Sequence, residues 1–390
     1  MPRFTVPRNI YYGKNALDEL SSCLKGYQKA FIVTGGNSMR RNGYISKLEQ
    51  ILANINIQTF VLDGVEPDPS IDTVMKGAKM MLDFKPDVII AIGGGSPIDA
   101  AKGMWIFYEH PELTFEDIKQ PFSLPPLRNK AIFAAIPSTS GTASEVTAFS
   151  VITDYSSGIK YPIADFEITP DIAVLDAEIP LSMPEMLTAH TGMDALTHAI
   201  EAYTATAHSR FSDPLALAAI SDIFDYLADS VQGNSQSRGI MHIAQCLAGM
   251  AFSNALLGIA HSIAHKTGAV FHLPHGCCNA ILLPYVMQYN APACMERYAQ
   301  IACYLGLSGK SKKSLTESLL QKIRVLNHNL NIPYCFRDAG VSESLLCTHI
   351  SQIAENACSD PCTASNPRPI DQARMEEVIR CAYYGTSVIV

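Results

Sequence analysis

Apolar positions follow two alternating rhythms along the first half of the chain. Short runs rich in valine, isoleucine and alanine are typical of buried strands, and the stretches between them repeat apolar residues every three or four positions, as helices do. The predicted strands cover residues 30–35, 59–65, 87–95, 130–137 and 172–176, and the predicted helices include 46–55 and 71–84. This β-α-β order predicts a parallel sheet covered by helices.

The segment 147–165 departs from this rhythm. Two extended runs flank Tyr155-Ser156-Ser157-Gly158, a sequence typical of a turn between antiparallel strands. The segment therefore predicts a β-hairpin outside the parallel sheet.

The second half of the chain is almost wholly helical in its periodicity. After Pro180, long segments with helical spacing continue to about residue 383, and strand patterns nearly vanish. We therefore expect an α/β domain with a Rossmann-like parallel sheet over residues 1–180 and an all-helical domain over residues 181–390.

Composition and charge narrow the classes of function. Of the 390 residues, 48% are apolar and 17% are charged, as in ordinary folded proteins, and the net charge of −8 provides no basic excess for nucleic acid or an anionic membrane. No apolar run reaches the length of about 18 residues that a transmembrane helix needs, and the first residues lack the apolar core of a signal peptide. The eleven cysteines include no CxxC pair. We expect a cytoplasmic protein that acts on a small molecule, without nucleic-acid or membrane partners.

A glycine-rich turn, GGGSPIDAAK (93–102), starts at the end of the predicted strand 87–95. Its three glycines allow a ligand to approach the backbone closely. Ser96 is expected to cap the following helix, with Pro97 at the first helical position and Asp99 completing a capping box. Free amides at such a helix start bind anions, so the turn predicts a pyrophosphate site although it is not the usual GxGxxG fingerprint. The glycines are Gly93, Gly94 and Gly95.

A second polar loop, PSTSGTASE (137–145), follows the next predicted strand. Carboxyl ends of parallel strands meet at one edge of a sheet, so this loop is expected beside the glycine turn. Its hydroxyl groups belong to Ser138, Thr139 and Thr142.

Two helical segments offer ligands for a metal ion. Asp194 and His198 stand four residues apart among apolar neighbours, so both project from one helix face. A buried carboxylate and imidazole are costly unless they pair or bind a metal. His261 and His265 repeat this spacing on a second helix, which is expected to end by Gly268.

Two more histidines, His272 and His275, lie in the turn-rich sequence FHLPHG after that helix. Asp194, His198 and His261 with one of these two would give one oxygen and three nitrogen ligands. Such a set suits a divalent first-row metal, and spacing alone does not decide among His265, His272 and His275.

These motifs together resemble the iron-containing alcohol dehydrogenase family. The resemblance includes EPDPS (66–70), GGGSPIDAAK, PSTSGTASEVT, GMDALTHAIEAY (192–203) and GIAHSIAHKTGAVFHLPHGCCNAILLPYV (258–286), and it runs nearly end to end. Details such as WIFYEHPE (105–112) resemble the alcohol dehydrogenase half of bifunctional aldehyde–alcohol dehydrogenases. The resemblance implies a dehydroquinate synthase-like architecture and a homodimer or larger homo-oligomer.

The resemblance also implies roles for single residues. His265 would lie near the metal and substrate as a proton shuttle, Lys160 would reach the cofactor ribose, and Phe252 would border the substrate. The implied metal ligands are Asp194, His198, His261 and His275. The implied cofactor residues are Gly93, Gly94, Gly95, Ser96, Asp99, Ser138, Thr139 and Thr142.

The sequence after the first strand departs from the pattern of many NAD-dependent relatives. Gly35 stands where those relatives carry a carboxylate for the adenosine ribose, and Gly36, Asn37 and Ser38 follow it. A carboxylate there would repel a 2′-phosphate, whereas polar groups near Arg40 and Arg41 would accommodate one. We therefore expect NADP(H) to be used at least as well as NAD(H).

The implied reaction is the interconversion of small primary alcohols, of the ethanol, butanol or short-diol class, and their aldehydes. Fe(II), or Zn(II) in its place, would act as a Lewis acid, and hydride would pass between substrate and nicotinamide. Oxidation of a polyol, as in glycerol dehydrogenase, is one alternative. A lyase resembling dehydroquinate synthase is another, but it would need a strongly basic pocket, and the neighbours of the predicted ligands are largely apolar.

Overall fold

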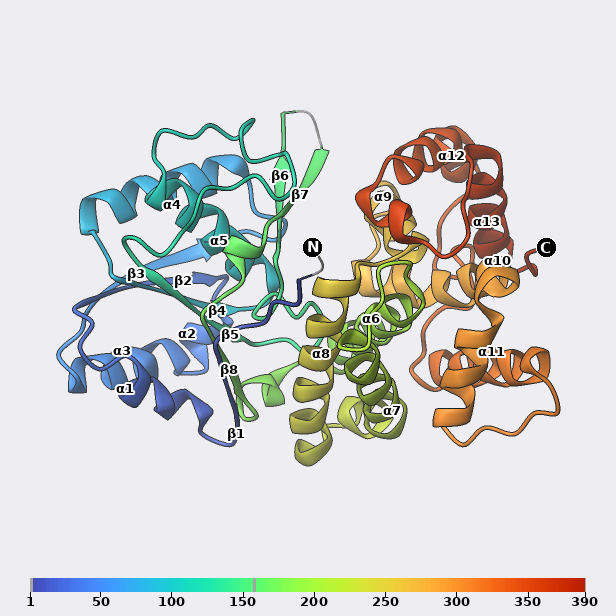
Figure 1. Ribbon diagram of the computed structural model, residues 1–390, viewed down its shortest axis with the longest axis horizontal. Coiled ribbons are helices and arrows are strands. Elements are labelled where there is room, and N and C mark those ends of the chain that lie inside the picture. Colours follow the sequence, from blue (N-terminus) through green and yellow to red (C-terminus); the bar gives the residue numbers. More distant parts are fainter. Residues whose placement is uncertain (1–2, 157–158, 390) are drawn as a thin grey trace. The chain divides into compact units, whose positions relative to one another are not determined.

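The computed structural model describes residues 3–156 and 159–389 (Figure 1). The chain divides into two compact units, Met1–Ser182 and Met183–Val390.

A six-stranded sheet forms the centre of the first unit, in the order β1-β8-β5-β4-β2-β3. All of its pairings are parallel, which confirms the predicted α/β class. Strand β1 was not predicted, because its short sequence NIYYG becomes a strand only by pairing with β8. The strands are β1 (Asn9–Gly13), β2 (Lys29–Gly35), β3 (Gln58–Val65), β4 (Val88–Gly93), β5 (Ile132–Pro137) and β8 (Ile172–Asp176).

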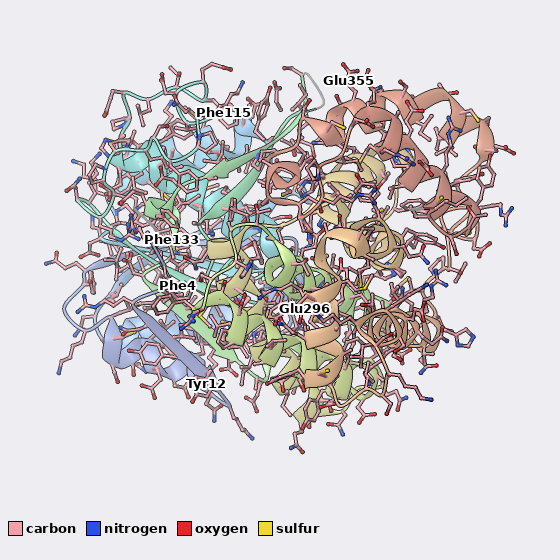
Figure 2. All side chains as sticks on the ribbon, turned by 45° about the vertical axis from the view of Figure 1, so that its right-hand side comes forward. Phe4, Tyr12, Phe115, Phe133, Glu296 and Glu355 are labelled. Atoms are coloured by element: carbon pink, nitrogen blue, oxygen red, sulfur yellow. The ribbon has the colours of Figure 1, made fainter. Side chains whose placement is uncertain are left out.

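Helices cover both faces of the sheet because alternate strand residues point to opposite sides (Figure 1). Ile89 of β4 and Phe133 of β5 belong to a core shared with α4 and α5; Phe133 is labelled in Figure 2. Ile90 belongs to a second core, which α1 and α3 cover. The helical segments are η1 (Ala16–Glu19), α1 (Leu20–Cys23), α2 (Ser38–Arg41), α3 (Tyr44–Asn54), α4 (Ile71–Phe84), α5 (Gly95–Glu109), η2 (Phe166–Ile168) and η3 (Ile179–Ser182).

The predicted hairpin is present beside this sheet. Strands β6 (Phe149–Asp154) and β7 (Ile159–Ala164) pair in antiparallel fashion, as a separate two-stranded sheet. Two of the four predicted turn residues, Ser157 and Gly158, lie outside the described residues.

The second unit is built from helices, as predicted. Helix α6 packs against α7, α8 and α10, so its polar face is enclosed by three neighbours. The elements are α6 (Glu185–Thr204), α7 (Ser212–Val231), α8 (Ser235–Ala255), α9 (Ile259–Phe271), α10 (His275–Tyr304), α11 (Lys312–Asn329), α12 (Glu343–Cys358), η4 (Pro361–Ser365) and α13 (Gln372–Tyr384).

None of the helices in the described part of the chain is by itself long and apolar enough to cross a membrane. Helices α8 and α9 reach the required length and hydropathy only when they are taken together, across a bend of 107°.

Candidate metal centre and cofactor loop

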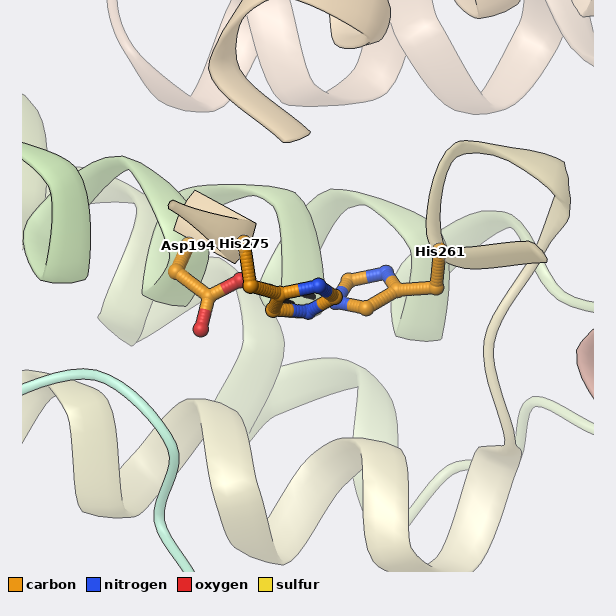
Figure 3. A group of neighbouring side chains, drawn as sticks. All are labelled: Asp194, His261 and His275. Atoms are coloured by element: carbon orange, nitrogen blue, oxygen red, sulfur yellow. Dashed lines mark ion pairs between the residues drawn. The ribbon is translucent and has the colours of Figure 1, made fainter. Parts of the chain in front are cut away.

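Three of the predicted ligands converge in the second unit. Asp194 comes from α6, His261 from α9, and His275 is the first residue of α10. One donor atom from each lies within 4.8 Å of the others. Asp194 Oδ1 lies 3.7 Å from His261 Nε2 and 3.6 Å from His275 Nε2, and Figure 3 shows the three side chains gathered in one place.

His198 stands beside this group rather than within it. It follows Asp194 by one helical turn on α6, and its ring stacks on that of His261 with centroids 4.4 Å apart. It also stacks on the ring of Phe252, the predicted substrate-pocket residue, at 4.3 Å. The four predicted ligands and Phe252 therefore form one cluster, which is buried except at His275, whose side chain is 40% exposed.

The charges of this cluster favour a cation. Burial alone would raise the pKa of Asp194, but the imidazoles of His198, His275 and His261 outweigh it and hold that pKa well below its usual range. Burial would lower the pKa of His261, but the nearby carboxylates of Asp194 and Glu201 outweigh it and raise the pKa to about 9. The carboxylates of Asp194 and Glu201 thus stabilise positive charge at the position of the His261 imidazole.

The donor set also fits a divalent metal. His261 Nε2 is buried and makes no hydrogen bond with any described residue, although it lies near the Asp194 carboxylate. Such an atom is expensive to leave without a partner, and a metal ion would supply one. One carboxylate oxygen with imidazole nitrogens, and no sulfur, is a set that iron or zinc accepts.

His265 and His272 separate from the ligand group. The ring of His265 stacks on that of His275 at 5.3 Å, and its Nδ1 lies 3.1 Å from Asp360 Oδ2. His272 is exposed and ends α9 with a left-handed φ of 54°. The prediction that this helix ends by Gly268 was wrong, because a single glycine is tolerated inside a helix and the turn continues to Phe271.

Three polar residues at the centre were not predicted. Asn279 donates through Nδ2 to Asp194 Oδ1 at 2.7 Å and also lies 3.1 Å from His275 Nε2. Glu201 contacts His261, and Asp360 contacts His265. Helical spacing could have indicated the first two, since Asn279 follows His275 by one turn and Glu201 lies on the face of Asp194. Asp360 lies too far along the chain for spacing to find it.

The glycine turn in the first unit begins a helix without a side-chain cap. Gly93 has a φ of +149°, Gly94 is the N-cap, and α5 starts at Gly95. The prediction that Ser96 caps this helix was wrong, since the helix starts before it. The backbone amides of the first turn are therefore available to an anion instead of a side chain.

The second polar loop lies against this turn, as predicted. Ser138 N donates to Gly93 O at 2.7 Å. A Cβ on Gly94 would lie 3.5 Å from Thr139, and one on Gly95 would lie 3.1 Å from Thr142. A side chain at Gly95 would crowd this cradle, which fits a backbone that receives a pyrophosphate.

Two predicted cofactor residues have partners within the protein. Asp99 does not complete a capping box, because its Oδ2 accepts from the backbone amide of Val151 at 3.0 Å. Burial raises the pKa of Asp99 to about 6, against the lowering effect of Lys102. Lys160 forms an ion pair with Asp68, with 2.7 Å between nitrogen and oxygen.

The segment after β2 is open to solvent and lies near the glycine turn. A Cβ on Gly35 would lie 3.5 Å from Pro97 of α5 and 3.0 Å from Val65 O. Gly36, Asn37 and Ser38 are exposed. Arg40 is also exposed and forms an ion pair of 2.6 Å with Asp63.

Family models match both units of the chain. Residues 7–177 match the iron-containing alcohol dehydrogenase model, and residues 188–383 match the model of the C-terminal part of the Fe-containing alcohol dehydrogenase family. The chain belongs to the iron-containing alcohol dehydrogenase family. It is an oxidoreductase of this family, as the sequence motifs predicted.

Several members of the family resemble this chain over nearly its full length. An NADPH-dependent butanol dehydrogenase of Clostridium saccharobutylicum is 58% identical over 388 residues, covering 100% of both chains. A bifunctional aldehyde-alcohol dehydrogenase of Escherichia coli is 40% identical and covers 98% of this chain, which spans only 46% of that enzyme.

Solved structures of the family share the fold. The iron-containing alcohol dehydrogenase of Thermococcus thioreducens has a TM-score of 0.91 at 35% identity and covers 98% of this chain and 100% of its own. A 1,3-propanediol oxidoreductase has a TM-score of 0.92 at 35% identity, with the same coverage of both chains.

Proposed function

We propose that the chain reduces short-chain aldehydes to primary alcohols reversibly, with NADPH as its preferred cofactor and a divalent metal held by Asp194, His198, His261 and His275. The observation that best supports this proposal is the convergence of Asp194, His261 and His275 around one small space. Within it, the buried His261 Nε2 has no hydrogen-bond partner among the described residues. Iron is the metal that the family name implies, and zinc fits the same donors.

When bound, the metal supplies Lewis acidity toward the substrate oxygen, and the nicotinamide supplies the hydride chemistry. The protein holds these groups. Gly93, Gly94, Gly95 and Ser96 would bind the pyrophosphate with the amides at the start of α5. The neighbouring loop would contact the cofactor through Ser138, Thr139 and Thr142. Lys160 would have to break its ion pair with Asp68 to reach the ribose.

The preference for NADPH rests on the exposed segment after β2. Gly35 puts no carboxylate against a 2′-phosphate, and Gly36, Asn37 and Ser38 leave room for one. The name of the butanol dehydrogenase relative supports the same preference. Arg40 could contribute its charge, although its ion pair with Asp63 would have to rearrange.

His265 is proposed to move the proton that accompanies hydride transfer. Asp360 holds its Nδ1 at 3.1 Å, which leaves Nε2 to exchange a proton with the substrate oxygen or a water. The side chain is a quarter exposed, at 25%, so solvent can reach it.

The substrate is expected to be small and largely apolar. Phe252 is buried against the ring of His198 and leaves an apolar wall beside the centre. The propanediol oxidoreductase among the structural relatives extends the class to short diols. A cytoplasmic location and a homo-oligomeric state stay predictions.

The decisive experiment combines the purified protein with butanal and NADPH or NADH, following the absorbance of the reduced nicotinamide. We expect turnover that is faster with NADPH in kcat/KM, and loss of turnover after chelation that iron or zinc restores. Glycerol with NAD or NADP serves as the comparison substrate. Turnover of glycerol but not butanal would overturn the proposal in favour of polyol oxidation, and a strong NADH preference would overturn the cofactor assignment.

A further inference from the structure

Glu201 is a buried carboxylate on the same face of α6 as Asp194 and His198. It follows Asp194 by seven residues and His198 by three, which is helical spacing for one face. Its exposed fraction is 5%. A carboxylate this deeply buried needs several hydrogen-bond donors, and the start of α9 supplies them.

Three N–H groups from the start of α9 donate to Glu201. The amide of Gly258 donates to Oε2 at 3.0 Å, and the amide of Ala260 donates to Oε1 at 2.8 Å. The Nδ1 of His261 lies 2.6 Å from Oε2. Helix α9 has no side-chain cap of its own at Gly258, so a carboxylate from α6 fixes where it begins.

The contact with Nδ1 also fixes the proton of His261. The amides of Gly258 and Ala260 already donate to both oxygens of Glu201, so the carboxylate accepts from Nδ1 as well. Nδ1 therefore carries a hydrogen, and Nε2 is the ring nitrogen left to bind a metal. Nε2 is the atom that lies 3.7 Å from Asp194 Oδ1 and makes no hydrogen bond among the described residues. Glu201 thus selects the tautomer that a metal requires.

The backbone before His261 has little freedom to compensate for a lost contact. Ser365 Oγ donates to Leu257 O at 2.7 Å, and the amide of Ile259 lies 3.4 Å from Asn366 Oδ1. A Cβ on Gly258 would lie 2.8 Å from Glu201 Oε1, so the chain passes directly over the carboxylate.

We propose that Glu201 is a positioning residue, which sets the tautomer and ring orientation of His261 so that Nε2 binds the metal. The proposal rests on the metal site of the proposed function. Glu201 itself touches neither metal nor substrate; it acts through His261.

Glu201→Gln separates this role from simple packing because the two side chains have nearly the same shape. If the amide oxygen accepts from Ala260, the amide NH2 faces Nδ1 and forces the proton of His261 onto Nε2. If the oxygen faces Nδ1, the NH2 group meets the amide N–H of Ala260. Either arrangement disfavours the metal-bound state.

The experiment measures Zn(II) and Co(II) binding to the metal-free full-length protein by competition with a chromophoric chelator. Glu201→Gln should bind both metals about 10- to 100-fold more weakly and should change the Co(II) absorption spectrum. Glu201→Asp, which keeps a carboxylate, should recover part of the affinity. NADPH binding, followed by fluorescence, should stay as in the unsubstituted protein.

Glu109→Gln is the matched control. Glu109 is also a buried glutamate of 5% exposure, and it accepts backbone amides of Asn129, Lys130 and Ala131 in the other unit. It should lose stability without losing metal affinity.

Three results separate failure of this proposal from failure of the metal site. Unchanged metal affinity and Co(II) spectrum in Glu201→Gln, with loss of metal in His261→Ala, would overturn the role of Glu201 alone. Unchanged affinity in both His261→Ala and Asp194→Ala would overturn the site itself. If Glu201→Gln does not fold, Glu201→Asp decides, since unaltered affinity and spectrum in that shorter variant would count against the proposal.

Discussion

Gly276→Ala should disable the metal centre through a backbone contact, without altering any ligand. Gly276 follows His275 at the start of α10, where a Cβ would lie 2.2 Å from His190 O and 3.3 Å from Asp194 Cβ. Normal contact between a carbon and a carbonyl oxygen needs more than about 3.2 Å, so α10 would have to move roughly 1 Å from α6. Both atoms that conflict belong to rigid elements, since His190 O is backbone, so rotation of a side chain cannot relieve the overlap.

A shift of this size is large on the scale of the site. Both His275 and Asn279 reach Asp194 from α10, with Nε2 and Nδ2 at 3.6 Å and 2.7 Å from Oδ1. Metal ligands tolerate errors of about 0.2 Å, so a shift of roughly 1 Å removes His275 from the coordination sphere. We expect metal affinity to fall about 100-fold or more, and kcat to fall by a similar factor. The free energy of unfolding should fall by about 1–3 kcal/mol from overpacking.

Metal content after dialysis, and activity after reconstitution with iron or zinc, measure this effect. Gly77→Ala provides the comparison, because a Cβ there would lie 2.3 Å from Met104 Sδ, the flexible part of a side chain in the other unit. Gly77→Ala should keep metal content and activity. If Gly276→Ala also kept both, close contact between α10 and α6 would not be what sets the distance from His275 to Asp194.

Three further perturbations test the segment after β2, the contacts of Asp360 with His265 and Lys266, and the metal site. Gly35→Asp should lower the ratio of kcat/KM for NADPH over NADH by about tenfold or more, or about 1.4 kcal/mol, because a carboxylate repels the 2′-phosphate; an unchanged ratio would exclude this position from the specificity. The pKa of Asp360 is well below its usual range, because His265 and Lys266 outweigh the raising effect of burial, so the ionised carboxylate stabilises the fold above about pH 4 and this stability is lost as the pH falls. In metal-free protein, urea unfolding of Asp360→Asn should show a loss of about 3 kcal/mol at pH 7 that shrinks below pH 4, whereas an equal loss at both would refute the ionic origin. Chelation should lower Tm, and metal at 100 times its Kd should raise the free energy of unfolding by about 2.7 kcal/mol. A Tm that is the same with and without metal would argue against a site in the folded chain.

Much of the architecture could be predicted because the hydrophobic pattern of the buried strands and helices reflects their burial. Every residue of β4 is buried, so its continuous apolar run predicts a strand without knowledge of its partners. Strand β1 is different, since it lies at the edge of the sheet and its Tyr12, labelled in Figure 2, is 70% exposed. Its sequence carries little apolar signal, and pairing with β8 alone defines it.

The start of α5 shows where capping preferences fail. Ser96 and Asp99 have the spacing of a capping box, which predicts a helix beginning at Pro97. The structure places Gly95 against Thr142 and gives the Asp99 carboxylate to the amide of Val151, from a strand that lies far along the chain. Contacts with the neighbouring loop therefore override the local preference, and they leave the helix start open for an anion.

At the metal centre, residues with a periodic signal could be predicted and those held by tertiary contacts could not. Pairs four residues apart identify Asp194 with His198 and His261 with His265, but spacing could not choose between His272 and His275. That choice depends on where α9 ends and α10 begins, because the break leaves His272 exposed and turns His275 toward Asp194. The two histidines of α9 each have a carboxylate at Nδ1, which comes from Glu201 for His261 and from Asp360 for His265. Sequence motifs therefore locate the atoms that would bind the metal, whereas the groups that orient those atoms emerge only when distant segments pack together.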